Sequence, residues 1–564
     1  MILEELCAYY ERARAGDAST LGAYGFQFRR LDLVIEIHED GSFARLLPTK
    51  NLSAHQDQRF LLPMEKKRAR QIAPNLLWDH GAYVLGLGEG DQHTSKKRLA
   101  FAAQISELAA AHPQHRGLAA LDGFYQQGHW KMAAQVCDRE AGGLRNPTLS
   151  FRLCGQESLI AEDQALHPWL LAQLEEEGAP RLRCMISGEW DTLALVHPTI
   201  KGLKGALGVG ATLVSFQQES SRFYGKKQGE NAPIGKRTAF AYTSALNELL
   251  RPGSDRVVHF DELSLVFWAE SATEWEEGFA QFLSLKCGQE SYEEFYKKLA
   301  SGHWESDTSS FFILALSVQK TRISVRYWQK FSIQEMQQHL RKFFLDLHII
   351  HAPYEAQNLS LYAIAAAMSD EEKASAIESS RFLELFHAIF DGKMYPQSFF
   401  YITMGLIRKE KRISYHRAAI VKAYLVRSAK YYPVQEEVGV ALDPALTQVA
   451  YALGRLFAVL ERLQEEALQH ASNLRERYYT TASTSPAAVF PHILRQKNTY
   501  LARMSNRTLR ERFERDIAEI FERIQDIPIS LSLTDQGRFV IGYYHQRQEY
   551  FTAPKRRRDE EQVS

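Results

Sequence analysis

Residues 309–328, SSFFILALSVQKTRISVRYW, mark the point at which strand-forming sequence gives way to helix-forming sequence. In the second half, RISVRYW (322–328), apolar side chains alternate with polar ones, a period of two that is typical of a β-strand. The polar face carries Arg322, Ser324 and Arg326. The pattern predicts a strand with one apolar and one cationic face, and a solvated sheet face explains the cations equally well.

More strand signals lie N-terminal of this stretch. Residues 26–48, FQFRRLDLVIEIHEDGSFARLLP, place apolar side chains at period two between Leu31 and Ile37, and the turn Glu-Asp-Gly at 39–41 predicts a hairpin. Further strands are predicted at 181–190, 211–217 and 263–270, and helices at 1–15, 97–111 and 117–134. The first part of the chain is therefore expected to be mixed α/β.

Long helical periods replace the strand signals after about residue 330. The strongest helix, from Leu446 to about Thr480, carries apolar side chains at helical spacing. Three more amphipathic segments follow at 485–504, 505–525 and 537–551. Four helices in about 120 residues, joined by short links, predict a helical bundle.

The expected fold class is α+β, with the chain divided into three domains. A mixed α/β region with antiparallel sheets is expected at 1–340, a helical connecting region at 341–435 and a four-helix bundle at 436–564. A chain of 564 residues is too long for one hydrophobic core, which favours several domains.

Composition describes an ordinary globular protein, with 45% hydrophobic and 24% charged residues. The five cysteines form no CxxC pair, which favours a reducing cytoplasm over a disulfide scaffold or a zinc site. Neither a signal peptide nor a membrane span is expected, because no apolar run of about 18 residues occurs. The 68 basic and 68 acidic residues balance, so affinity for a polyanion would require local segregation of charge.

The sequence lacks familiar catalytic motifs. It contains no GxxxxGK[ST], HExxH or GxSxG, and its nineteen histidines show no spacing typical of metal ligands. We therefore expect a binding protein with no catalytic residue, no metal and no cofactor. A nuclease or other nucleic-acid-processing enzyme, with a site assembled from distant positions, is the alternative.

Residues 221–237, SRFYGKKQGENAPIGKR, combine five basic side chains with one acid. Three glycines and a proline interrupt regular structure, and glycine lets the backbone approach a ligand closely. The cations suit phosphate groups, whereas Gln228 and Asn231 carry amides that can pair with base edges. The composition predicts a loop that grips a nucleic acid. A solvated loop, or one that holds a partner subunit or an RNA, is the alternative.

Other segments are also rich in cations. MEKKRARQIAPN (64–75) places four basic side chains before Asn75, which could read a base edge or cap its own turn. Between residues 408 and 430 eight cations stand against Glu410 alone, and the C-terminal bundle uses arginine far more than lysine. Arginine suits phosphate contact because its guanidinium group is bidentate. These segments are further candidates for nucleic-acid contact.

Several of the segments resemble one known family. VHPTIKGLKGALGVGATLVSFQ (196–217), YGKKQGENAPIGKRTAFAYTSALNELL (224–250) and LSLVFWAE (263–270) resemble the core of the large subunit of the type I-C CRISPR surveillance complex (Cascade). The resemblance continues in order through APNLLWDHGAYVLG, RISVRYW, YALGRLFAVLERLQEEA and STSPAAVFPHIL, and so covers almost the whole chain. Its most specific part is QGENAP followed by AFAYTSALN.

The resemblance implies a subunit without an active site of its own. Such subunits recognise the protospacer-adjacent motif (PAM) on double-stranded DNA, promote duplex opening and R-loop formation, and support recruitment of a helicase-nuclease. The implied partners are crRNA at its 5′-handle end, double-stranded target DNA, the backbone and handle-binding subunits, the helicase-nuclease, and a small subunit made from an internal start of the same gene. A purely architectural subunit is a competing function.

The sequence departs from the family pattern in places. Gln217 stands where the family usually has Asn, and Val318-Gln319 stands where it has Pro-Asn. The amide of Gln217 keeps the chemistry of that contact with an altered reach. No methionine lies between Met404 and Met504, so an internal start near Val438 or Val440 would need a non-AUG codon.

These arguments give two groups of candidate residues. The DNA- and PAM-binding group is Lys226, Lys227, Gln228, Asn231, Lys236, Arg237, Asn75, Arg68 and Arg70. A second group, for weaker contact with the nucleic-acid backbone, is Gln217, Arg322, Arg326, Arg417 and Lys422.

Overall fold

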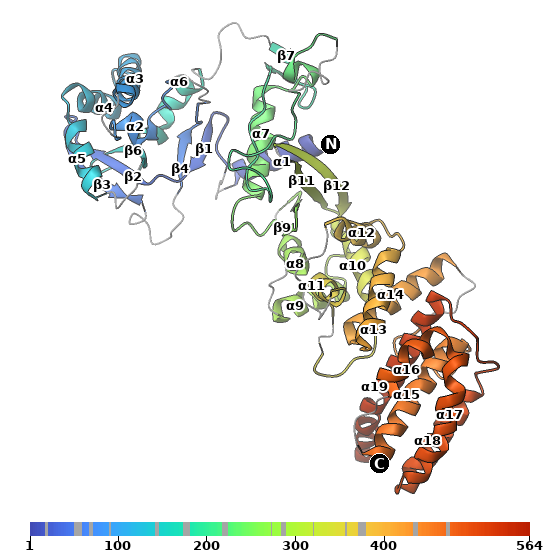
Figure 1. Ribbon diagram of the computed structural model, residues 1–564. Coiled ribbons are helices and arrows are strands. Elements are labelled where there is room, and N and C mark those ends of the chain that lie inside the picture. The colour runs from blue at the N-terminus through green and yellow to red at the C-terminus, as the bar shows by residue number, and fades with distance from the viewer. Residues whose placement is uncertain are drawn as a thin grey trace. The chain divides into compact units, whose positions relative to one another are not determined.

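The computed structural model describes residues 1–16, 21–49, 59–66, 72–88, 92–140, 146–172, 181–216, 224–271, 273–283, 289–319, 321–355, 358–369, 379–432, 438–469 and 474–563. The chain divides into two compact units, the first comprising 1–202 and 207–252 and the second 203–206 and 253–564 (Figure 1). The fold class is α+β, as predicted. The predicted domain boundaries at 340 and 435 fall within the second unit and stay predictions.

A four-stranded sheet with strand order β3-β2-β6-β5 forms one part of the first unit. Its strands are β2 (Leu33–Ile37), β3 (Phe43–Pro48), β5 (Trp78–His80) and β6 (Thr148–Leu153). β2 and β3 form the predicted antiparallel hairpin, and β6 lies parallel to β2. The connection from β5 to β6 contains α2 (Gly81–Val84), α3 (Gln92–Ala111), α4 (Arg116–Gln126) and α5 (Trp130–Glu140).

Glu36 lies in the middle of β2, which is buried along its whole length. Its carboxylate accepts hydrogen bonds from Arg45 Nε at 2.5 Å and from Arg152 Nη2 at 2.6 Å. A buried carboxylate is tolerated where cations and hydrogen bonds surround it. The polar position that interrupts the apolar strand is therefore accommodated by arginines from the two neighbouring strands, β3 and β6.

The remaining elements of the first unit carry the predicted nucleic-acid-binding loop. β1 (Phe26–Arg29) pairs with β4 (Phe60–Pro63), and β7 (Arg181–Arg183) pairs with β8 (Trp190–Thr192), both antiparallel. α1 (Ile2–Ala15) packs along α7 (Lys236–Leu249), and α6 (His167–Ala172) precedes β7. The strand predicted at 211–217 is wrong in its described part, where Ala211 makes only an isolated bridge with Ile200, because the preceding glycine-rich segment folds into turns.

An antiparallel sheet of order β12-β11-β10-β9 begins the second unit. Its strands are β9 (Val257–Phe260), β10 (Leu263–Ala269), β11 (Ser310–Gln319) and β12 (Arg322–Ser332). The register between β11 and β12 shifts next to Ala315, where Arg326 is the extra residue of a bulge. Val325, which the simple alternation placed on an apolar face, is consequently 42% exposed.

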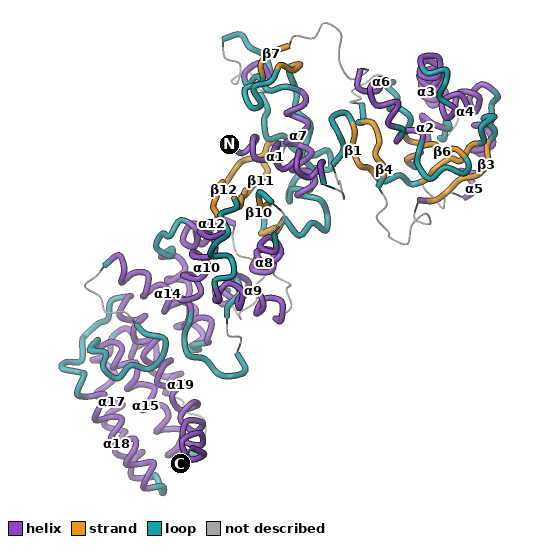
Figure 2. Tube along the Cα trace, turned by 180° about the vertical axis from the view of Figure 1, so that it is seen from behind, coloured by secondary structure: helices purple, strands orange, loops and turns teal. Residues whose placement is uncertain are grey.

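Helices complete the second unit (Figure 2). The first group is α8 (Glu274–Leu283), α9 (Gln289–Ser301), α10 (Ile333–Leu347), α11 (Leu361–Ala367), α12 (Ser379–Phe390), α13 (Gln397–Glu410) and α14 (Tyr415–Tyr431). The C-terminal group is α15 (Val449–Leu468), α16 (Leu474–Thr484), α17 (Pro486–Arg503), α18 (Arg507–Phe521) and α19 (Leu533–Val563). The helix predicted from Leu446 to about Thr480 is divided into α15 and α16, and the other three predicted helices of the bundle correspond to α17, α18 and α19.

Two glycines bring α15 and α19 into backbone contact. A Cβ atom at Gly454 would overlap the carbonyl oxygen of Phe539, and one at Gly542 would overlap that of Tyr451. Side chains of other residues would hold the two helix axes farther apart. One apolar cluster then runs from Phe260 in β9 through these helices, so the second unit shares a single core.

Candidate nucleic-acid interface

The described part of the predicted loop, residues 224–237, presents cations to solvent. The side chains of Lys226, Lys227 and Gln228 are exposed, and that of Tyr224 is 99% exposed. A tyrosine in this position buries no apolar surface, so folding gains nothing from its ring. An exposed aromatic side chain among cations is the combination that stacks on bases and neutralises phosphates.

The loop is held in place through its backbone. The N–H of Gly229 donates to the carbonyl of Leu195 at 3.0 Å, and a Cβ atom at Gly229 would overlap the carbonyl oxygen of Ala194. The backbone N–H of Lys227 donates to Glu230 Oε2 at 2.6 Å, which closes the short 3₁₀ turn at 228–231. The side chains of the lysines are therefore not needed to maintain the loop.

Three residues of the loop adopt a left-handed backbone conformation. Gly225 has a φ of 75°, and Tyr224 and Gln228 also adopt positive φ values, of 54° and 45°. Non-glycine residues rarely occupy this left-handed region, and they cluster where a structure serves function. The turn therefore carries local strain on either side of the two lysines.

The loop leads directly into the first turn of α7. Gly235 is the N-cap, and the N–H of Arg237 donates to Oδ2 of Asp191 from the preceding hairpin at 2.8 Å. No acidic side chain occupies the first turn, which instead holds Lys236 and Arg237. Cations at a helix N-terminus oppose the helix dipole, whereas an anion there is stabilised. The carboxylate of Asp191 already supplies an anion at this helix N-terminus, and Lys236 and Arg237 stand beside it.

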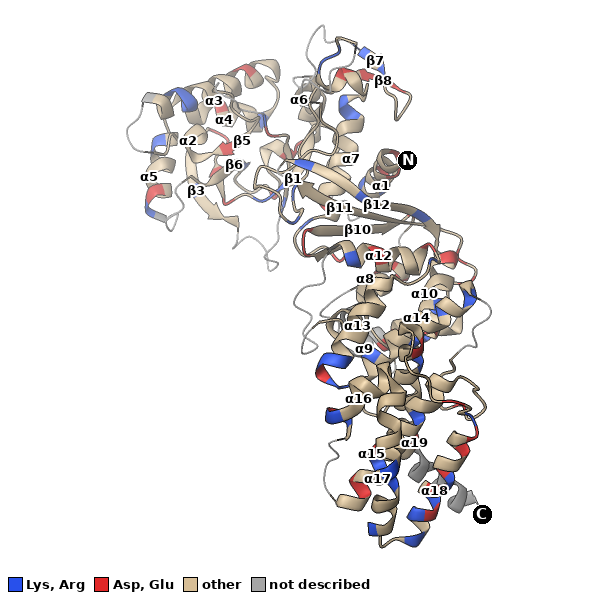
Figure 3. Cartoon of the chain, turned by 45° about the vertical axis from the view of Figure 1, so that its right-hand side comes forward, with Lys and Arg blue, Asp and Glu red and all other residues tan. Residues whose placement is uncertain are grey.

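The hairpin formed by β7 and β8 adds cations that lie outside the predicted loop. Arg181 and Arg183 are exposed on β7 (Figure 3), and Trp190 on β8 is 66% exposed. The hairpin is joined to the loop by the hydrogen bond from Met185 N to the carbonyl of Pro233, at 2.9 Å. We call residues 181–192 and 224–237 together the cationic edge.

The amides of the cationic edge differ in availability. Asn231 Nδ2 donates to the carbonyl of Gln228 at 3.0 Å, so part of this side chain stabilises the turn itself. The Gln228 side chain is exposed and projects from the turn. Gln228 is therefore the better placed of the two predicted amides to contact a ligand.

A cysteine lies under the start of α7. Burial raises the pKa of the Cys184 thiol, but the N–H groups of Gly235 and Ser187, with hydroxyl groups of Thr238 and Ser187, lower it to about 7. Cys184 is only 2% exposed, so its thiolate would be an internal anion beneath the cationic edge. Cys7, whose Sγ donates to the Thr238 carbonyl at 3.8 Å, has its pKa raised to about 12, mainly by burial.

The structure places Asn75 in the interior of the first unit. Its side chain is fully buried, and Oδ1 accepts a hydrogen bond from Lys66 N at 2.9 Å while its own N–H donates to Asp79 at 2.8 Å. The side chain therefore links Asn75 to a segment nine residues earlier and does not cap its own turn, and its burial corrects the prediction that Asn75 reads a base. Arg68 and Arg70, from the same segment, lie outside the described residues.

The weaker candidates separate into two classes. Arg322 and Arg326 are exposed on β12, where Arg326 Nε donates to Ser317 Oγ at 2.7 Å. They belong to the second unit, whereas the cationic edge belongs to the first. Gln217 lies outside the described residues.

Arg417 and Lys422 of α14 are buried, which corrects the prediction that they face a nucleic acid. Arg417 is fully buried and donates to both oxygens of Glu410, at 2.7 and 2.9 Å. Lys422 Nζ donates to the backbone carbonyls of Leu345 and Asp346, at 3.2 and 3.1 Å. Both cations join helices of the second unit to one another.

Within the described residues, no group of three or more His, Cys, Asp and Glu side chains converges as metal ligands do. The same part of the chain contains no helix with both the length and the apolar character needed to cross a bilayer. What the described part of the cationic edge offers chemically is a set of cations, the exposed amide of Gln228 and the exposed rings of Tyr224 and Trp190. That set binds anions and stacks on planar groups.

A family model described as CRISPR-associated protein (Cas_Csd1) matches residues 6–551, which is nearly the whole chain. A search of curated proteins finds no match.

Proposed function

The chain belongs to the CRISPR-associated Cas_Csd1 family, and from this premise we propose that it is the non-catalytic large subunit of a type I-C interference complex. In this role it recognises the PAM on double-stranded DNA, promotes duplex opening and R-loop formation, and supports recruitment of the helicase-nuclease. Its partners are the crRNA, the target DNA, and the backbone and handle-binding subunits.

The cationic edge is the observation that carries this proposal. Lys226 and Lys227 are exposed on a turn anchored by the backbone of Gly229, and Lys236 with Arg237 stands at a helix N-terminus. Phosphate contacts from such cations provide affinity without sequence information. Duplex DNA supplies a regular row of phosphates for an edge of this kind.

Recognition of a short motif requires directional groups in addition to charge. Gln228 presents an exposed amide between the lysines and the helix N-terminus. A side-chain amide that pairs with a base edge discriminates by about 1–3 kcal/mol. We therefore assign phosphate contact to the lysines and arginines, and base contact to Gln228.

Footprinting of the assembled complex tests the proposal. Hydroxyl-radical cleavage of a target duplex is compared for complexes with and without this chain. We expect protection of the PAM and its flanking phosphates only when the chain is present. Equal protection in both samples would contradict the proposal and leave an architectural subunit.

The non-catalytic assignment has its own test. The purified chain is incubated with labelled single- and double-stranded DNA in the presence of Mg²⁺ or Mn²⁺. We expect the substrates to remain intact. Metal-dependent cleavage that co-purifies with the chain through several columns would replace the binding role with that of a nuclease.

The C-terminal helices support a further part of the proposal, that α15–α19 also form a separate small subunit from an internal start. Mass spectrometry of the complex expressed from the single gene tests this. A fragment of about 120 residues, the size of the bundle, is expected. Detection of the full-length chain alone, in a complex of complete activity, would contradict it.

A further inference from the structure

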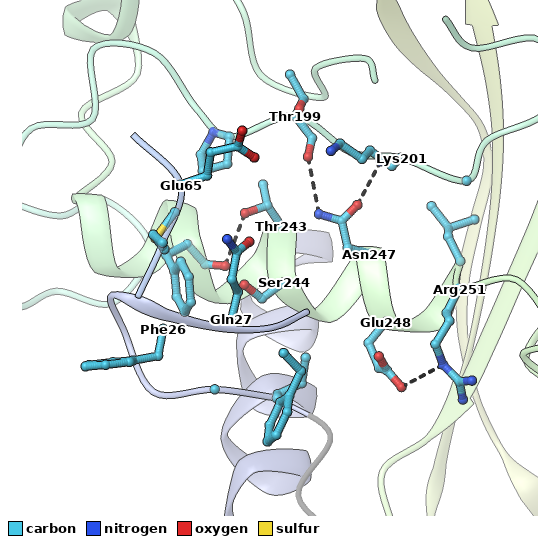
Figure 4. Close-up of a pocket in the computed structure, with 18 of the residues that line it drawn as sticks. Phe26, Gln27, Glu65, Thr199, Lys201, Thr243, Ser244, Asn247, Glu248 and Arg251 are labelled. Atoms are coloured by element: carbon cyan, nitrogen blue, oxygen red, sulfur yellow. Dashed lines mark hydrogen bonds and ion pairs between the residues drawn. The ribbon is translucent and has the colours of Figure 1, made fainter. Parts of the chain in front are cut away.

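A cavity of about 580 Å³ lies within the first unit, between the β1–β4 pair, the segment 198–202 and the C-terminal half of α7 (Figure 4). Cavities of about 300–1,000 Å³ hold small ligands in proteins. The candidate residues of the cationic edge do not line it. We call it the α7 cavity.

The walls of the α7 cavity are fixed by close backbone contacts. Gly202, with a φ of 83°, lies so near the end of α7 that a Cβ atom would overlap the carbonyl oxygen of Leu250. Asn247 of α7 donates from Nδ2 to the Thr199 carbonyl at 3.2 Å and accepts from Lys201 N at 2.7 Å. Asn247 therefore positions the 198–202 segment and has little capacity left for a ligand.

Gln27 of β1, unlike Asn247, has a side-chain donor that no described residue uses. Its side chain reaches the α7 cavity beside Thr243 and Ser244 (Figure 4), and its Nε2 finds no hydrogen-bond partner among the described residues. A buried donor without a partner destabilises the folded protein, because it has lost its hydrogen bonds to water. A ligand that brings an acceptor into the cavity would complete this hydrogen bond.

The charge of the lining favours an anion. Among the described residues, four cations, Arg59, Lys66, Lys201 and Arg251, line the cavity with two carboxylates, Glu65 and Glu248.

Both carboxylates are already matched by arginines. Glu65 pairs with Arg29 at 2.6 Å, and Glu248 pairs with Arg251 at 3.1 Å and with Arg59 at 3.4 Å. The exposed ammonium group of Lys201 lies at the rim on the anchored segment. An anionic group at this rim would meet a positive charge held at a defined place.

The remaining lining suits a flat, partly apolar group. Phe26, Phe28 and Phe240 contribute aromatic carbon, and Ser244 contributes a hydroxyl group. A ligand that combines a flat ring bearing hydrogen-bond acceptors with a phosphate matches all of these features. A nucleotide has this chemistry, and an unpaired one can present its base edge to a side-chain amide.

We infer that the α7 cavity binds one unpaired nucleotide of a single-stranded nucleic acid, with its base at Gln27 and its phosphate at Lys201. This inference rests on the proposed function, because it requires that the chain meets nucleic acid. It places a single-strand contact inside the first unit, apart from the duplex contact assigned to the cationic edge. The strand can come from the RNA or from opened DNA, which share this nucleotide chemistry.

Photo-crosslinking of the assembled complex tests the inference and identifies the strand. One sample contains crRNA substituted with 4-thiouridine, and the other contains target DNA substituted with 4-thiothymidine. After irradiation, cross-linked peptides are mapped by mass spectrometry. We expect a cross-link in one of the two samples within residues 26–28, 198–202 or 243–248. Cross-links confined to other residues in both samples would overturn the inference.

Substitutions in the α7 cavity should lower the cross-link yield by different factors. Ser244→Phe fills the cavity and should lower the cross-link yield at least about ten-fold, since the base can no longer enter. Gln27→Leu should lower it about five-fold, the loss expected for one uncharged hydrogen bond. Ser95→Phe, on an exposed position of α3 outside the cavity, is the matched control and should leave the yield unchanged.

Two further measurements distinguish an error in this inference from a misfolded variant and from an error in the proposed function. Lys201→Ala changes an exposed side chain and should lower the yield even if Ser244→Phe proves poorly folded by circular dichroism. If the cavity variants keep both the duplex footprint and the wild-type cross-link yield, the cavity inference alone is overturned. A footprint absent from the wild-type complex would instead overturn the proposed function.

Discussion

Residues 224–237 and α14 are both rich in cations, yet the cations named here differ in their exposure to solvent. In the loop, Lys226 and Lys227 are exposed and the turn is held by backbone groups. In α14, Arg417 and Lys422 are buried and bonded to other helices. The comparison indicates that a run of cations stays exposed, and so available to a ligand, only where the backbone supports itself without them.

The neighbouring residues explain this difference. In α14 the cations stand between apolar residues, in YHRAAIVKAYLVRSAKY, and a helix with that sequence is buried on most sides. In the loop, glycine, proline and amides surround the cations, and none of these drives burial. The two segments are alike in their content of cations, and they differ in whether apolar residues stand beside those cations.

The largest effect is expected when a buried cation of α14 is removed. Arg427 is 1% exposed and donates to Asp346, to the carbonyls of Ala388 and Lys393 at 2.8 Å, and to Tyr395. Arg427→Met should lower the free energy of unfolding of the second unit by about 3–5 kcal/mol, because Asp346 stays buried without its partner. Urea unfolding followed by circular dichroism measures this.

Arg412→Ala is the matched control, because Arg412 is exposed just before α14. Its unfolding midpoint should equal that of the wild type. Equal midpoints for Arg427→Met and Arg412→Ala would contradict the claim that buried cations stabilise the fold more than exposed ones do.

A smaller effect is expected for the buried acid of the first unit. Burial alone would raise the pKa of Glu36, but hydrogen bonds from Arg45 and Arg152 lower it below its usual value. Glu36→Gln should cost about 2 kcal/mol at pH 7, less than a fully buried pair, because Arg45 is largely exposed. Chemical unfolding of the two proteins at pH 7 gives the difference.

The pH dependence of that difference follows from the direction of the pKa shift. A carboxyl group whose pKa is lowered by folding stabilises the protein fully above its unfolded pKa of about 4.3. This stabilisation is lost as the pH falls through the lower, folded value. The gap between wild type and Glu36→Gln should therefore be constant from pH 7 to about pH 5 and shrink below that. A gap that widens in acid would contradict the assignment.

The smallest of these three stability effects is expected for the anchoring of the loop. Gly229→Ala introduces a Cβ atom against the carbonyl oxygen of Ala194, so the turn must move. We expect DNA affinity of the complex to fall about five-fold, with a local loss of about 1 kcal/mol in stability. Gly208→Ala, where a Cβ atom meets open space, should change neither quantity. Equal affinities for the two variants would show that the turn needs no anchor.

Much of the fold could be predicted from local patterns. The β2–β3 hairpin, β10, β11, β12 and the C-terminal helices follow from apolar periodicity, which depends only on neighbouring residues. The bulge at Arg326 and the backbone contact of Gly454 with α19 could not be predicted. Both depend on a partner segment that the local sequence does not contain.

The candidate interface shows the same limit. The loop was found because its residues are contiguous, and its alternating RLR neighbour at 181–183 lies about forty positions earlier, so no spacing rule joins them. Asn75 was selected as a base-reading residue, but its environment is set by Lys66 and by Asp79. The α7 cavity was missed because its walls come from three separate segments.

The salt dependence of DNA binding tests the central claim most directly. The complex carrying Lys226→Ala with Lys227→Ala is compared with the wild type in a filter-binding assay from about 50 to 200 mM salt, the range over which counterion release is pronounced. Since each phosphate contact contributes about 0.9 to the slope of log affinity against log salt, we expect the slope to fall by about 2. An unchanged slope, with the complex intact, would contradict the claim that these exposed lysines contact phosphate.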